Sequence, residues 1–286
     1  KQSKFDSQLT IDFLCHNRIE GIESILNIGH AHVIKASTKY NILQNKIYSL
    51  LGSDSYRISQ RRKALSKLSL DKRYDLFHAH FGYEGWISLD LATKHQLPLV
   101  ATFYGHDLSS IPQQFPVWGK RYLELFEKGM LFIVEGAFMK ETLIALGCPS
   151  EKVFILPIAI DLTINRFINS NINYTSLNEI NILLVGRFVE KKGFKYGIES
   201  FYELIKATNK RIVLHIVGGG PDEQELRELV IKYKLGDRVE FHGFLNYDQY
   251  QLLLVKVSVC LVPSITASNG EKEGGAPNVI LEMLGK

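Results

Sequence analysis

Two cations beside a glycine stand where the sequence could bind a phosphate. Gly186–Arg187 is followed by Lys191–Gly193, between a stretch that predicts a strand and one that predicts a helix. Arginine offers a planar pair of donors and lysine a compact charge, and each charged hydrogen bond contributes about 1.5 to 3 kcal/mol. Arg187 and Lys192 therefore suit the charges of a nucleoside diphosphate, although two surface cations on a loop would give the same pattern.

A glycine-rich turn follows the next predicted strand. Gly218–Pro221 comes directly after Arg211–Val217 and before a predicted helix. Glycine lets the backbone approach a ligand closely, and proline fits the first turn of a helix. A tight turn would use the same residues, so this run by itself favours neither ligand binding nor chain geometry.

Carboxylates flank a third turn near the end of the chain. The run Glu271–Pro277 reads EKEGGAP and leads into NVILE, which ends at Glu282. Free amides at the start of a helix attract anions and hydroxyl-rich groups. Carboxylates accept hydrogen bonds from sugar and ribose hydroxyls. Because an ordinary helix cap would rarely need this cluster, the turn indicates a binding site.

Strand-like and helix-like stretches alternate along the chain and must position these turns. Short apolar strands separated by amphipathic helices predict βαβ units, parallel sheets and an α/β fold. Ligands of such sheets bind outside the carboxyl ends of the strands, which is where the three turns lie. The predicted strands are Thr10–Leu14, Leu76–Ala79, Leu99–Phe103, Leu131–Val134, Val153–Leu156, Asn181–Val185, Arg211–Val217, Val239–His242 and Ser258–Pro263. The predicted helices are Trp86–His95, Gly119–Lys128, Phe138–Leu146, Lys195–Thr208, Asp222–Tyr233 and Asp248–Val255.

The length of 286 residues favours two domains. The stretch Asn165–Asn178 is rich in asparagine and has no strong period, so it reads as a linker. We therefore expect one domain over residues 1–175 and a second over residues 176–286. The chain begins without an initiator Met and stops just after a predicted helix begins, so we expect it to be truncated at both ends.

The cysteines and the apolar runs predict the cellular location of the protein. Cys15, Cys148 and Cys260 lie far apart and show no metal-binding spacing, which favours a reduced, cytoplasmic setting. No apolar run approaches the roughly 20 residues that span a bilayer, and nothing resembles a signal peptide.

The net charge is +4, and part of it is concentrated between Arg57 and Arg73. This basic cluster predicts a solvated helix face or, alternatively, contact with an anionic lipid or acceptor at the inner face of the membrane. Nucleic acid is excluded as a partner because the cluster lacks interleaved aromatic residues and no DNA-binding motif accompanies it. Its members are Arg57, Arg61, Arg62, Lys63, Lys67, Lys72 and Arg73.

In their order along the chain, the motifs resemble those of the retaining glycosyltransferases of family 4. The second half carries VGR-x4-KG, IVGGGP, FHGF and EGGAPNVILE; the first half carries FHAHFG and ATFYGHDL. The resemblance implies the GT-B arrangement, in which two Rossmann-like, doubly wound parallel-sheet domains face each other across a cleft. The first half is most similar to the branch that builds colanic acid and related exopolysaccharides.

The resemblance also implies roles for the donor-side residues. Arg187 and Lys192 match the pair that holds the donor diphosphate. Glu273 matches the acidic residue near the donor sugar, and Glu282 matches the residue that binds the ribose hydroxyls. Gly274–Gly275 match the backbone cradle between these two carboxylates.

Three further residues correspond to the nucleotide end of the donor. Gly219 matches a loop beside the nucleotide, and Gly243 and Phe244 match the place where the base docks. The sequence departs from the family's usual spacing here, because eight residues instead of seven separate Glu273 from Glu282. We interpret the extra residue as a loop insertion.

The first half supplies candidates for the sugar and the acceptor. His78 and His80 share one face of a predicted strand, a spacing that could bind a metal, but no further ligands are evident. We therefore expect His80 to line the cleft or to pack structurally. His106 and Asp107 follow a strand and are expected to contact the donor sugar or the acceptor. Related sequences often have His where Tyr104 stands and an aromatic residue where His106 stands.

The predicted function is transfer of a hexose from a UDP- or GDP-sugar to a lipid-linked or polysaccharide acceptor, with retention, in cell-surface polysaccharide synthesis. The resemblance implies that no metal and no cofactor takes part. Cations preorganised at the diphosphate would stabilise the leaving group. The alternatives are a nucleotide-sugar epimerase, which the EGGAP cluster disfavours, and a nucleotide-sugar-binding assembly subunit without turnover.

Overall fold

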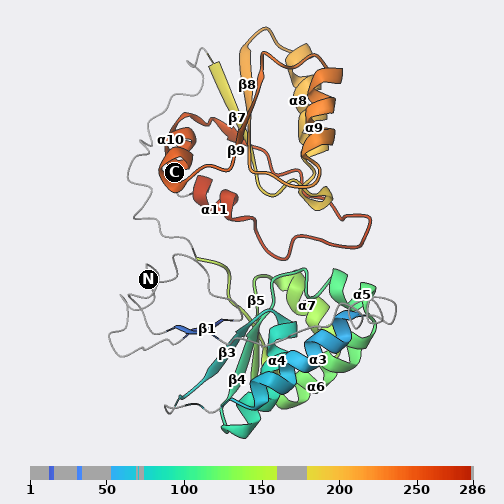
Figure 1. Cartoon of the computed structure of the whole chain (residues 1–286). Coiled ribbons are helices and arrows are strands. Elements are labelled where there is room, and N and C mark those ends of the chain that lie inside the picture. The colour runs from blue at the N-terminus through green and yellow to red at the C-terminus, as the bar shows by residue number, and fades with distance from the viewer. Residues whose placement is uncertain are drawn as a thin grey trace, which may run out of the picture.

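The computed structural model describes residues 13–15, 31–33, 53–68, 70, 74–159 and 179–284. It contains two parallel sheets of four strands each, one in each of two domains (Figure 1). A third, short sheet pairs β1 (Phe13–Cys15) with β2 (Ala31–Val33), also in parallel. The parallel α/β architecture expected from the alternating pattern is therefore confirmed.

The sheet of the N-terminal domain has the strand order β3-β4-β5-β6. Helices α4 and α6 pack against each other, and α3 packs along α4. The strands are β3 (Phe77–His80), β4 (Leu99–Thr102), β5 (Leu131–Val134) and β6 (Val153–Ile155). The helices are α3 (Ser53–Ser66), α4 (Gly82–Lys94), α5 (Ser110–Gln114), α6 (Val117–Lys128) and α7 (Ala137–Ala145).

Aromatic side chains fill the core of this domain. Phe103, Tyr122, Phe126 and Phe132 are fully buried, and their rings meet edge to face or at a tilt. Each such pair stabilises the fold by about 0.5 to 1.5 kcal/mol beyond the contribution of the apolar area that it buries. Since Phe103 directly follows β4, this core fixes the strand end from which the cleft residues project.

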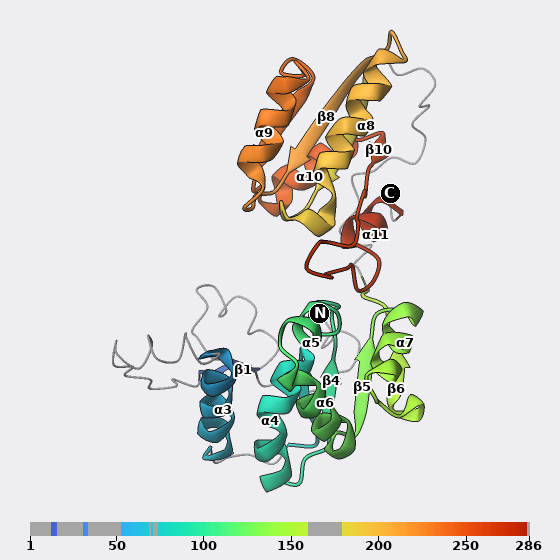
Figure 2. The same cartoon turned by 90° about the vertical axis from the view of Figure 1, so that its right-hand side faces the viewer.

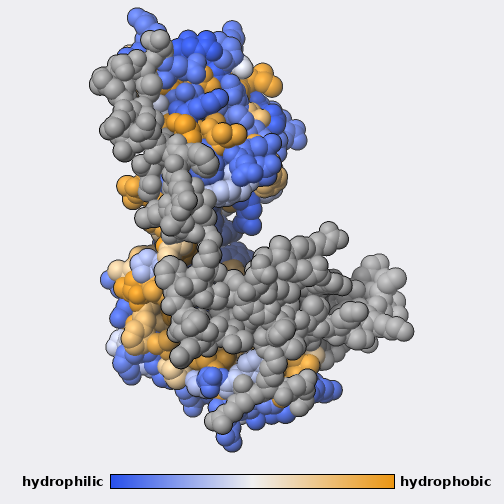
Figure 3. Space-filling model, turned by 90° about the vertical axis from the view of Figure 1, so that its left-hand side faces the viewer, coloured by the Kyte–Doolittle hydropathy of each residue, from blue (hydrophilic) through white to orange (hydrophobic). Residues whose placement is uncertain are grey.

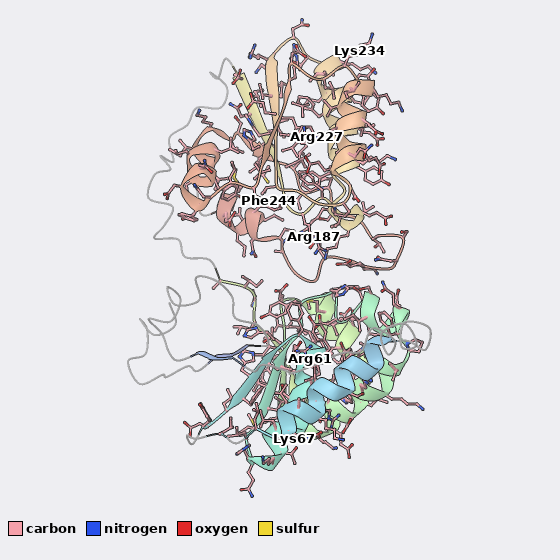
Figure 4. All side chains as sticks on the ribbon, in the orientation of Figure 1. Arg61, Lys67, Arg187, Arg227, Lys234 and Phe244 are labelled. Atoms are coloured by element: carbon pink, nitrogen blue, oxygen red, sulfur yellow. The ribbon has the colours of Figure 1, made fainter. Side chains whose placement is uncertain are left out.

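Ion pairs hold α3 on the rest of the domain. Arg61 forms a salt bridge of 2.9 Å with Glu84 of α4. Arg62 bonds both Asp90 of α4, at 2.6 Å, and Glu124 of α6, at 2.9 Å. Two members of the basic cluster are thus engaged inside the domain, which is neither of the two roles expected for them. Figure 4 shows Arg61 on this helix and Lys67 directly after its last residue; Lys67 is exposed.

The sheet of the C-terminal domain is covered on both faces. Ile182 and Leu184 of β7 face one core with α8 and α9, whereas Leu183 faces a second core with α10 and α11. Successive residues of a strand point to opposite faces, so a continuous apolar run suits a strand buried on both sides. Figure 2 shows α8 and α9 in front of the sheet and α10 behind it. The strands are β7 (Glu179–Val185), β8 (Arg211–Val217), β9 (Val239–Gly243) and β10 (Val259–Cys260), and the helices are α8 (Phe194–Lys206), α9 (Glu223–Lys232), α10 (Tyr247–Lys256) and α11 (Asn278–Leu284).

The strand order of this sheet, β10-β7-β8-β9, reverses direction at β7. The chain runs from β7 through β8 to β9 on one side and then returns through α10 to β10 on the other side. In open parallel sheets, ligands bind at such a switch point, in the crevice outside the carboxyl ends of the strands. The loops after β7 and β10 therefore flank the expected binding site.

The predicted boundary between the domains lies outside the described residues, which omit 160–178. Among the described helices, none is both long and apolar enough to cross a membrane. Apolar atoms gather on the lower domain in Figure 3, on the side of α7 and β6. Phe154, Ile155 and Leu156 contribute to this exposed apolar edge.

Candidate active site

A pocket of about 360 Å³ lies where the two domains meet. Tyr104, Glu135 and Ile158 line it from the N-terminal domain. The C-terminal domain contributes the loops after β7 and β10 together with α10 and α11, through Val185, Gly186, Lys192, Tyr250, Glu273, Gly274, Gly275, Ala276, Pro277, Asn278, Val279 and Glu282. The pocket thus opens at the carboxyl ends of strands from both sheets.

Lys192 and Glu273 face each other in this pocket across the switch point. Lys192 Nζ lies 2.7 Å from Glu273 Oε1, and each side chain is about a quarter exposed. Ser264 donates a hydrogen bond of 3.1 Å to the same carboxylate oxygen. The predicted diphosphate cation and the predicted sugar-side carboxylate are therefore direct neighbours.

The Ser264–Pro277 loop is fastened to the 3-10 turn η6 (Glu190–Lys192), which follows β7. Glu190 accepts hydrogen bonds from both the amide and the hydroxyl of Ser268, at 3.0 and 2.7 Å. Lys191 forms a salt bridge of 2.7 Å with Glu271. Burial alone would raise the pKa of Glu271, but Lys191, His106 and Arg187 outweigh it and lower the pKa. Hydrogen bonds from Ser268 to Glu190 and the Lys191–Glu271 salt bridge therefore hold the loop on η6 without a bound ligand.

Glycines allow the loops of this site to come close together. Gly193 has φ +64°, and a Cβ on it would lie 1.9 Å from the carbonyl oxygen of Pro263. Gly218 has φ +125°, and its Cβ would lie 1.9 Å from the carbonyl oxygen of Gly186. Both backbone conformations favour glycine, and both close approaches require it. The glycine-rich turn after β8 therefore serves chain geometry as well as any ligand.

Phe244 and Gly219 lie together at the end of β8 and β9. A Cβ on Gly219 would be 2.8 Å from the Phe244 ring, so the ring rests on the glycine backbone. The Gly243 carbonyl accepts a 2.8 Å hydrogen bond from the Gly218 amide, which ties the two strand ends together. Phe244 is 84% exposed and therefore offers an open aromatic face.

Glu282 is positioned by a tyrosine that the sequence did not reveal. The Tyr250 hydroxyl donates a hydrogen bond of 2.8 Å to Glu282 Oε2. Burial, together with this carboxylate, raises the pKa of Tyr250, so the phenol stays a donor. Tyr250 lies on α10, and no motif marked it.

Histidine and tyrosine form the N-terminal side of the cleft. His80 Nδ1 hydrogen-bonds the Tyr104 hydroxyl, and His78 Nε2 lies 2.8 Å from Thr102 Oγ1. The two imidazoles stack with centroids 4.6 Å apart. Burial lowers the pKa of both histidines. His80 therefore reaches the pocket through Tyr104, which lines it directly.

Asp107 is buried and faces the backbone instead of the pocket. Its carboxylate accepts hydrogen bonds from the Gly82 amide at 2.7 Å and the Tyr104 amide at 2.9 Å. The side chain is 0% exposed, and burial raises its pKa, although the amides from Gly82 and Tyr104 oppose the shift. Phe81, just before Gly82, has φ +74°, an unusual backbone angle that this carboxylate helps to hold. A direct substrate contact, which we expected for Asp107, would require it to leave both amides.

His106 contacts the C-terminal domain. Its Nδ1 lies 2.6 Å from Ser110 Oγ and 3.7 Å from Glu271 Oε1 of the Ser264–Pro277 loop. In the same loop, Lys272 Nζ lies over the Phe138 ring, 5.3 Å from its centroid, in a cation–π contact. This loop reaches down to the lower domain in Figure 1. His106 therefore takes part in an interdomain contact.

Two glycines, Gly105 and Gly274, bring the backbones of the two domains close together. A Cβ on Gly274 would lie 2.9 Å from the Tyr104 carbonyl oxygen and 3.0 Å from Gly105 Cα. A Cβ on Gly275 would lie 2.6 Å from a Glu135 carboxylate oxygen. Burial, then the charges of Asp107 and Glu273, raise the pKa of Glu135. The EGGAP turn is thus where the pocket closes against the N-terminal domain.

The structure brings five of the predicted site residues together at the pocket wall: Lys192, Glu273, Gly274, Gly275 and Glu282. Arg187, Gly219, Gly243, Phe244, His80, His106 and Asp107 are not among its lining residues. Figure 4 places Arg187 at the edge of the upper domain that faces the lower domain, with its side chain exposed.

Three residues that shape this site were not expected from the sequence: Tyr250, Glu135 and Lys191. Glu135 directly follows β5, so the rule that ligands bind at strand ends could have found it. Lys191 lies inside the VGR-x4-KG motif, directly before Lys192, but the motif assigns a role only to Lys192.

Two parallel-sheet domains, with a pocket at the facing strand ends and paired cations and carboxylates in its loops, define the GT-B class of glycosyltransferases. Two family models agree with this class. Residues 32–164 match "Glycosyltransferase Family 4", and residues 166–284 match "Glycosyl transferases group 1". The chain belongs to these glycosyltransferases and carries one domain of each kind in succession.

Three of the curated relatives are named for the synthesis of exopolysaccharides. The putative colanic acid biosynthesis glycosyltransferase WcaL of Salmonella typhimurium is 31% identical over 212 residues, which is 73% of this chain and 51% of the relative. Its Escherichia coli counterpart is 29% identical over 87% of this chain and 61% of its own length. The amylovoran biosynthesis glycosyltransferase AmsK of Erwinia amylovora is 29% identical over 73% of this chain and 51% of its own length. The chain thus spans about half to three fifths of these relatives.

Solved structures share the fold. The Anabaena protein Alr3699/HepE in complex with UDP and glucose has a TM-score of 0.69 at 17% identity, covering 96% of this chain and 70% of that one. The lipopolysaccharide outer core galactosyltransferase WaaB, in its apo form, has a TM-score of 0.65 at 13% identity, with 99% and 71% covered. At these identities the likeness concerns the fold alone.

Proposed function

We propose that this protein transfers a hexose, with retention, from a nucleoside diphosphate sugar to a lipid-linked or polysaccharide acceptor during exopolysaccharide synthesis. The observation that carries the proposal is the Lys192–Glu273 pair, in which the cation assigned to the diphosphate lies 2.7 Å from the carboxylate assigned to the sugar. The pair lies at the topological switch point, in a pocket between the two domains.

The donor would lie with its diphosphate at the loop after β7. Arg187 and Lys192 would bind the leaving diphosphate and stabilise the charge that develops there, without a metal ion. Glu273 would accept hydrogen bonds from the sugar, with the Gly274–Gly275 backbone beside it. Glu282, oriented by Tyr250, would accept hydrogen bonds from the ribose hydroxyls.

The base would rest on the exposed face of Phe244. The ring is supported from below by Gly219, so it is a preformed platform for a planar group. Uracil is the first base to test, because solved structures of similar fold contain UDP and UDP-glucose.

The acceptor would approach from the N-terminal domain. Tyr104 and Glu135 line that side of the pocket, and His80 supports Tyr104. His106 would set the distance between the domains through its contact with Glu271. Asp107 would act by holding the Tyr104 backbone. The curated relatives, named for colanic acid and amylovoran, support an exopolysaccharide acceptor.

We also propose a cytoplasmic location, with peripheral contact to anionic lipid through the basic cluster. Among its described members, Lys63 and Lys67 are exposed, whereas Arg61 and Arg62 are held in ion pairs. Two lysines supply a weak attraction of about 1 kcal/mol each near an anionic surface. Co-sedimentation with vesicles, with and without phosphatidylglycerol, tests this contact against the variant Lys63→Ala/Lys67→Ala.

Nucleotide-sugar binding is the first test of the proposed function. The protein is melted with UDP-, GDP- and ADP-sugars and with free sugars; a ligand at 100 times its Kd should stabilise it by about 2.7 kcal/mol. A selective shift with one nucleotide sugar supports the proposal. No shift with any of them would contradict both the transferase and the epimerase.

Sugar transfer then separates the remaining alternatives. Release of the nucleoside diphosphate together with a glycosylated acceptor identifies a transferase. Conversion of the donor to another nucleotide sugar identifies an epimerase. Binding without either reaction, tested with a range of lipid-linked acceptors, would favour the assembly subunit.

A further inference from the structure

Three potential metal ligands meet on one face of the C-terminal sheet, at its β9 edge (Figure 1). His215 lies on β8, and Glu240 and His242 lie two residues apart on β9. The strand register places His215 beside Glu240, and residues two apart on a strand share a face. None of the three lines the pocket between the domains, so this cluster is separate from the proposed donor site.

The ligand atoms of these side chains are almost equally spaced. His215 Nδ1 lies 2.9 Å from His242 Nε2 and 3.3 Å from Glu240 Oε2. His242 Nε2 lies 3.6 Å from the same carboxylate oxygen. In a tetrahedral zinc site with bonds of 2.0 to 2.1 Å, ligand atoms are about 3.3 Å apart. The three atoms therefore need to move by only a few tenths of an ångström to hold an ion.

A fourth side chain orients the buried histidine. His215 Nε2 lies 2.8 Å from Asn181 Oδ1 of β7. The amide oxygen can only accept, so it places the imidazole proton on Nε2 and leaves the Nδ1 lone pair facing Glu240 and His242. Histidine ligands of metals typically donate their other ring N–H to an oxygen in this way.

The surroundings favour a neutral imidazole and leave the site accessible. His215 is 7% exposed, and burial lowers its pKa, with Glu240 opposing the shift. Neutral imidazole is the form that binds metals. Glu240 is exposed, which gives an ion a path from solvent. Two imidazoles and one carboxylate suit Zn²⁺ and its transition-metal neighbours better than Mg²⁺ or Ca²⁺.

We propose that His215, Glu240 and His242 bind a Zn²⁺-class ion, with Asn181 as the positioning residue and water in the fourth place. The ion is a clamp between β8 and β9. His242 precedes Gly243, whose carbonyl is bonded to the Gly218 amide at 2.8 Å, so the clamp also fixes the two turns that carry Gly219 and Phe244.

Calorimetric titration of the chelator-treated, tag-free protein with zinc chloride tests the site. The wild type is expected to bind one equivalent and to melt at a higher temperature with zinc. His242→Ala and Glu240→Gln should each weaken binding at least tenfold; Glu240 is exposed, so its variant should fold. His95→Ala, a histidine change in the other domain, should leave the zinc affinity unchanged.

Substitutions at Asn181 distinguish a preorganised metal site from two histidines that are merely adjacent. Asn181→Ala should weaken zinc binding by roughly ten- to a hundredfold, as is usual when a partner of a metal ligand is removed. Asn181→Asp keeps an acceptor oxygen and should retain the affinity. Co²⁺ bound at the site should give the intense visible bands of tetrahedral coordination. Absence of saturable zinc binding, or binding that His242→Ala and Glu240→Gln leave unchanged, overturns the proposal.

Discussion

Lys192 Nζ and Glu273 Oε1 lie 2.7 Å apart, although 81 positions separate the two residues along the chain. The first follows β7 and the second lies in the loop after β10, the two strands that are adjacent where the strand order reverses. The strand order therefore brings this pair together. A bound nucleotide sugar would place its diphosphate at Lys192 and its sugar at Glu273.

Removing either predicted diphosphate cation should weaken donor binding. Arg187→Ala and Lys192→Ala each remove about one charged hydrogen bond of 1.5 to 3 kcal/mol, which corresponds to a ten- to hundredfold higher Kd for UDP. Isothermal titration with UDP measures this change. Lys195→Ala is the matched control, because Lys195 is exposed and its contact with Glu225 is long, at 3.9 Å.

The carboxylate partner should behave differently in the same assay. Glu273→Gln is expected to keep UDP binding within about threefold, while transfer falls sharply, because the carboxylate is assigned to the sugar. Equal UDP affinity in wild type and both cation variants would refute the diphosphate assignment.

Gly274→Ala should impair transfer without unfolding either domain. The added Cβ would meet the Tyr104 carbonyl at 2.9 Å and Gly105 Cα at 3.0 Å, so the EGGAP turn must shift away from the N-terminal domain. A displacement of about 1 Å in a reaction geometry can cost roughly a hundredfold in rate. Gly236→Ala, whose Cβ would meet nothing within 4 Å, is the control. Wild-type transfer in Gly274→Ala would show that this close approach is dispensable.

Much of this site follows from the sequence because motif and topology coincide. The strands Leu131–Val134 and Arg211–Val217 have the predicted bounds, because each is a continuous apolar run: the second is buried on both faces after Arg211, and the first alternates partly buried with buried residues. The glycines, cations and carboxylates of the turns after β7 and β10 predict where these turns lie, and Gly186, Lys192 and Glu273–Pro277 of these turns line the pocket. Local chemistry at strand ends was therefore predictable.

Contacts between distant elements were not predictable. Helix α3 has a polar sequence, and two of its arginines, Arg61 and Arg62, are paired with Glu84, Asp90 and Glu124, which lie 23 to 62 positions away. No local pattern shows that a cation faces a core. The amide partners of Asp107 could not be predicted either, because one of them, Gly82, lies 25 positions away at the start of another helix.

Phe244→Ala should weaken binding of the donor nucleotide and leave stability unchanged. The ring is 84% exposed and contributes little to the core, but stacking of a base on an aromatic face contributes about 1 to 3 kcal/mol. UDP binding is expected to weaken about five- to a hundredfold. Tyr247→Ala, which removes another exposed aromatic ring of the same domain, should have no such effect. Unchanged UDP affinity in Phe244→Ala would place the base elsewhere.

Asp107→Asn should destabilise the N-terminal side of the cleft. The substitution replaces one acceptor oxygen with an NH₂ group that faces a backbone amide, so a buried donor loses its partner at a cost of about 1 to 3 kcal/mol. Hydrogen exchange should then accelerate in the segments around Gly82 and Tyr104. The exposed Asp75 provides the control, since Asp75→Asn should change stability by less than about 0.5 kcal/mol. Exchange rates like those of the wild type would contradict the positioning role.

Glu124 should make the stability of the N-terminal domain depend on acid pH. Hydrogen bonds from Arg62, opposed by burial and aided by Lys128 and Trp86, lower the pKa of Glu124 from 4.5 to about 2. The folded state therefore binds fewer protons, and the stabilisation is complete above pH 4.5 and disappears as the pH falls toward 2.

Glu124→Gln removes this contribution at every pH. The difference in melting temperature between wild type and variant should therefore be largest above about pH 5 and should shrink steadily toward pH 2. Glu127→Gln, on the same helix, controls for the general loss of a carboxylate. A constant difference between Glu124→Gln and the wild type across this range would mean that the carboxylate of Glu124 is not held in its charged form by Arg62.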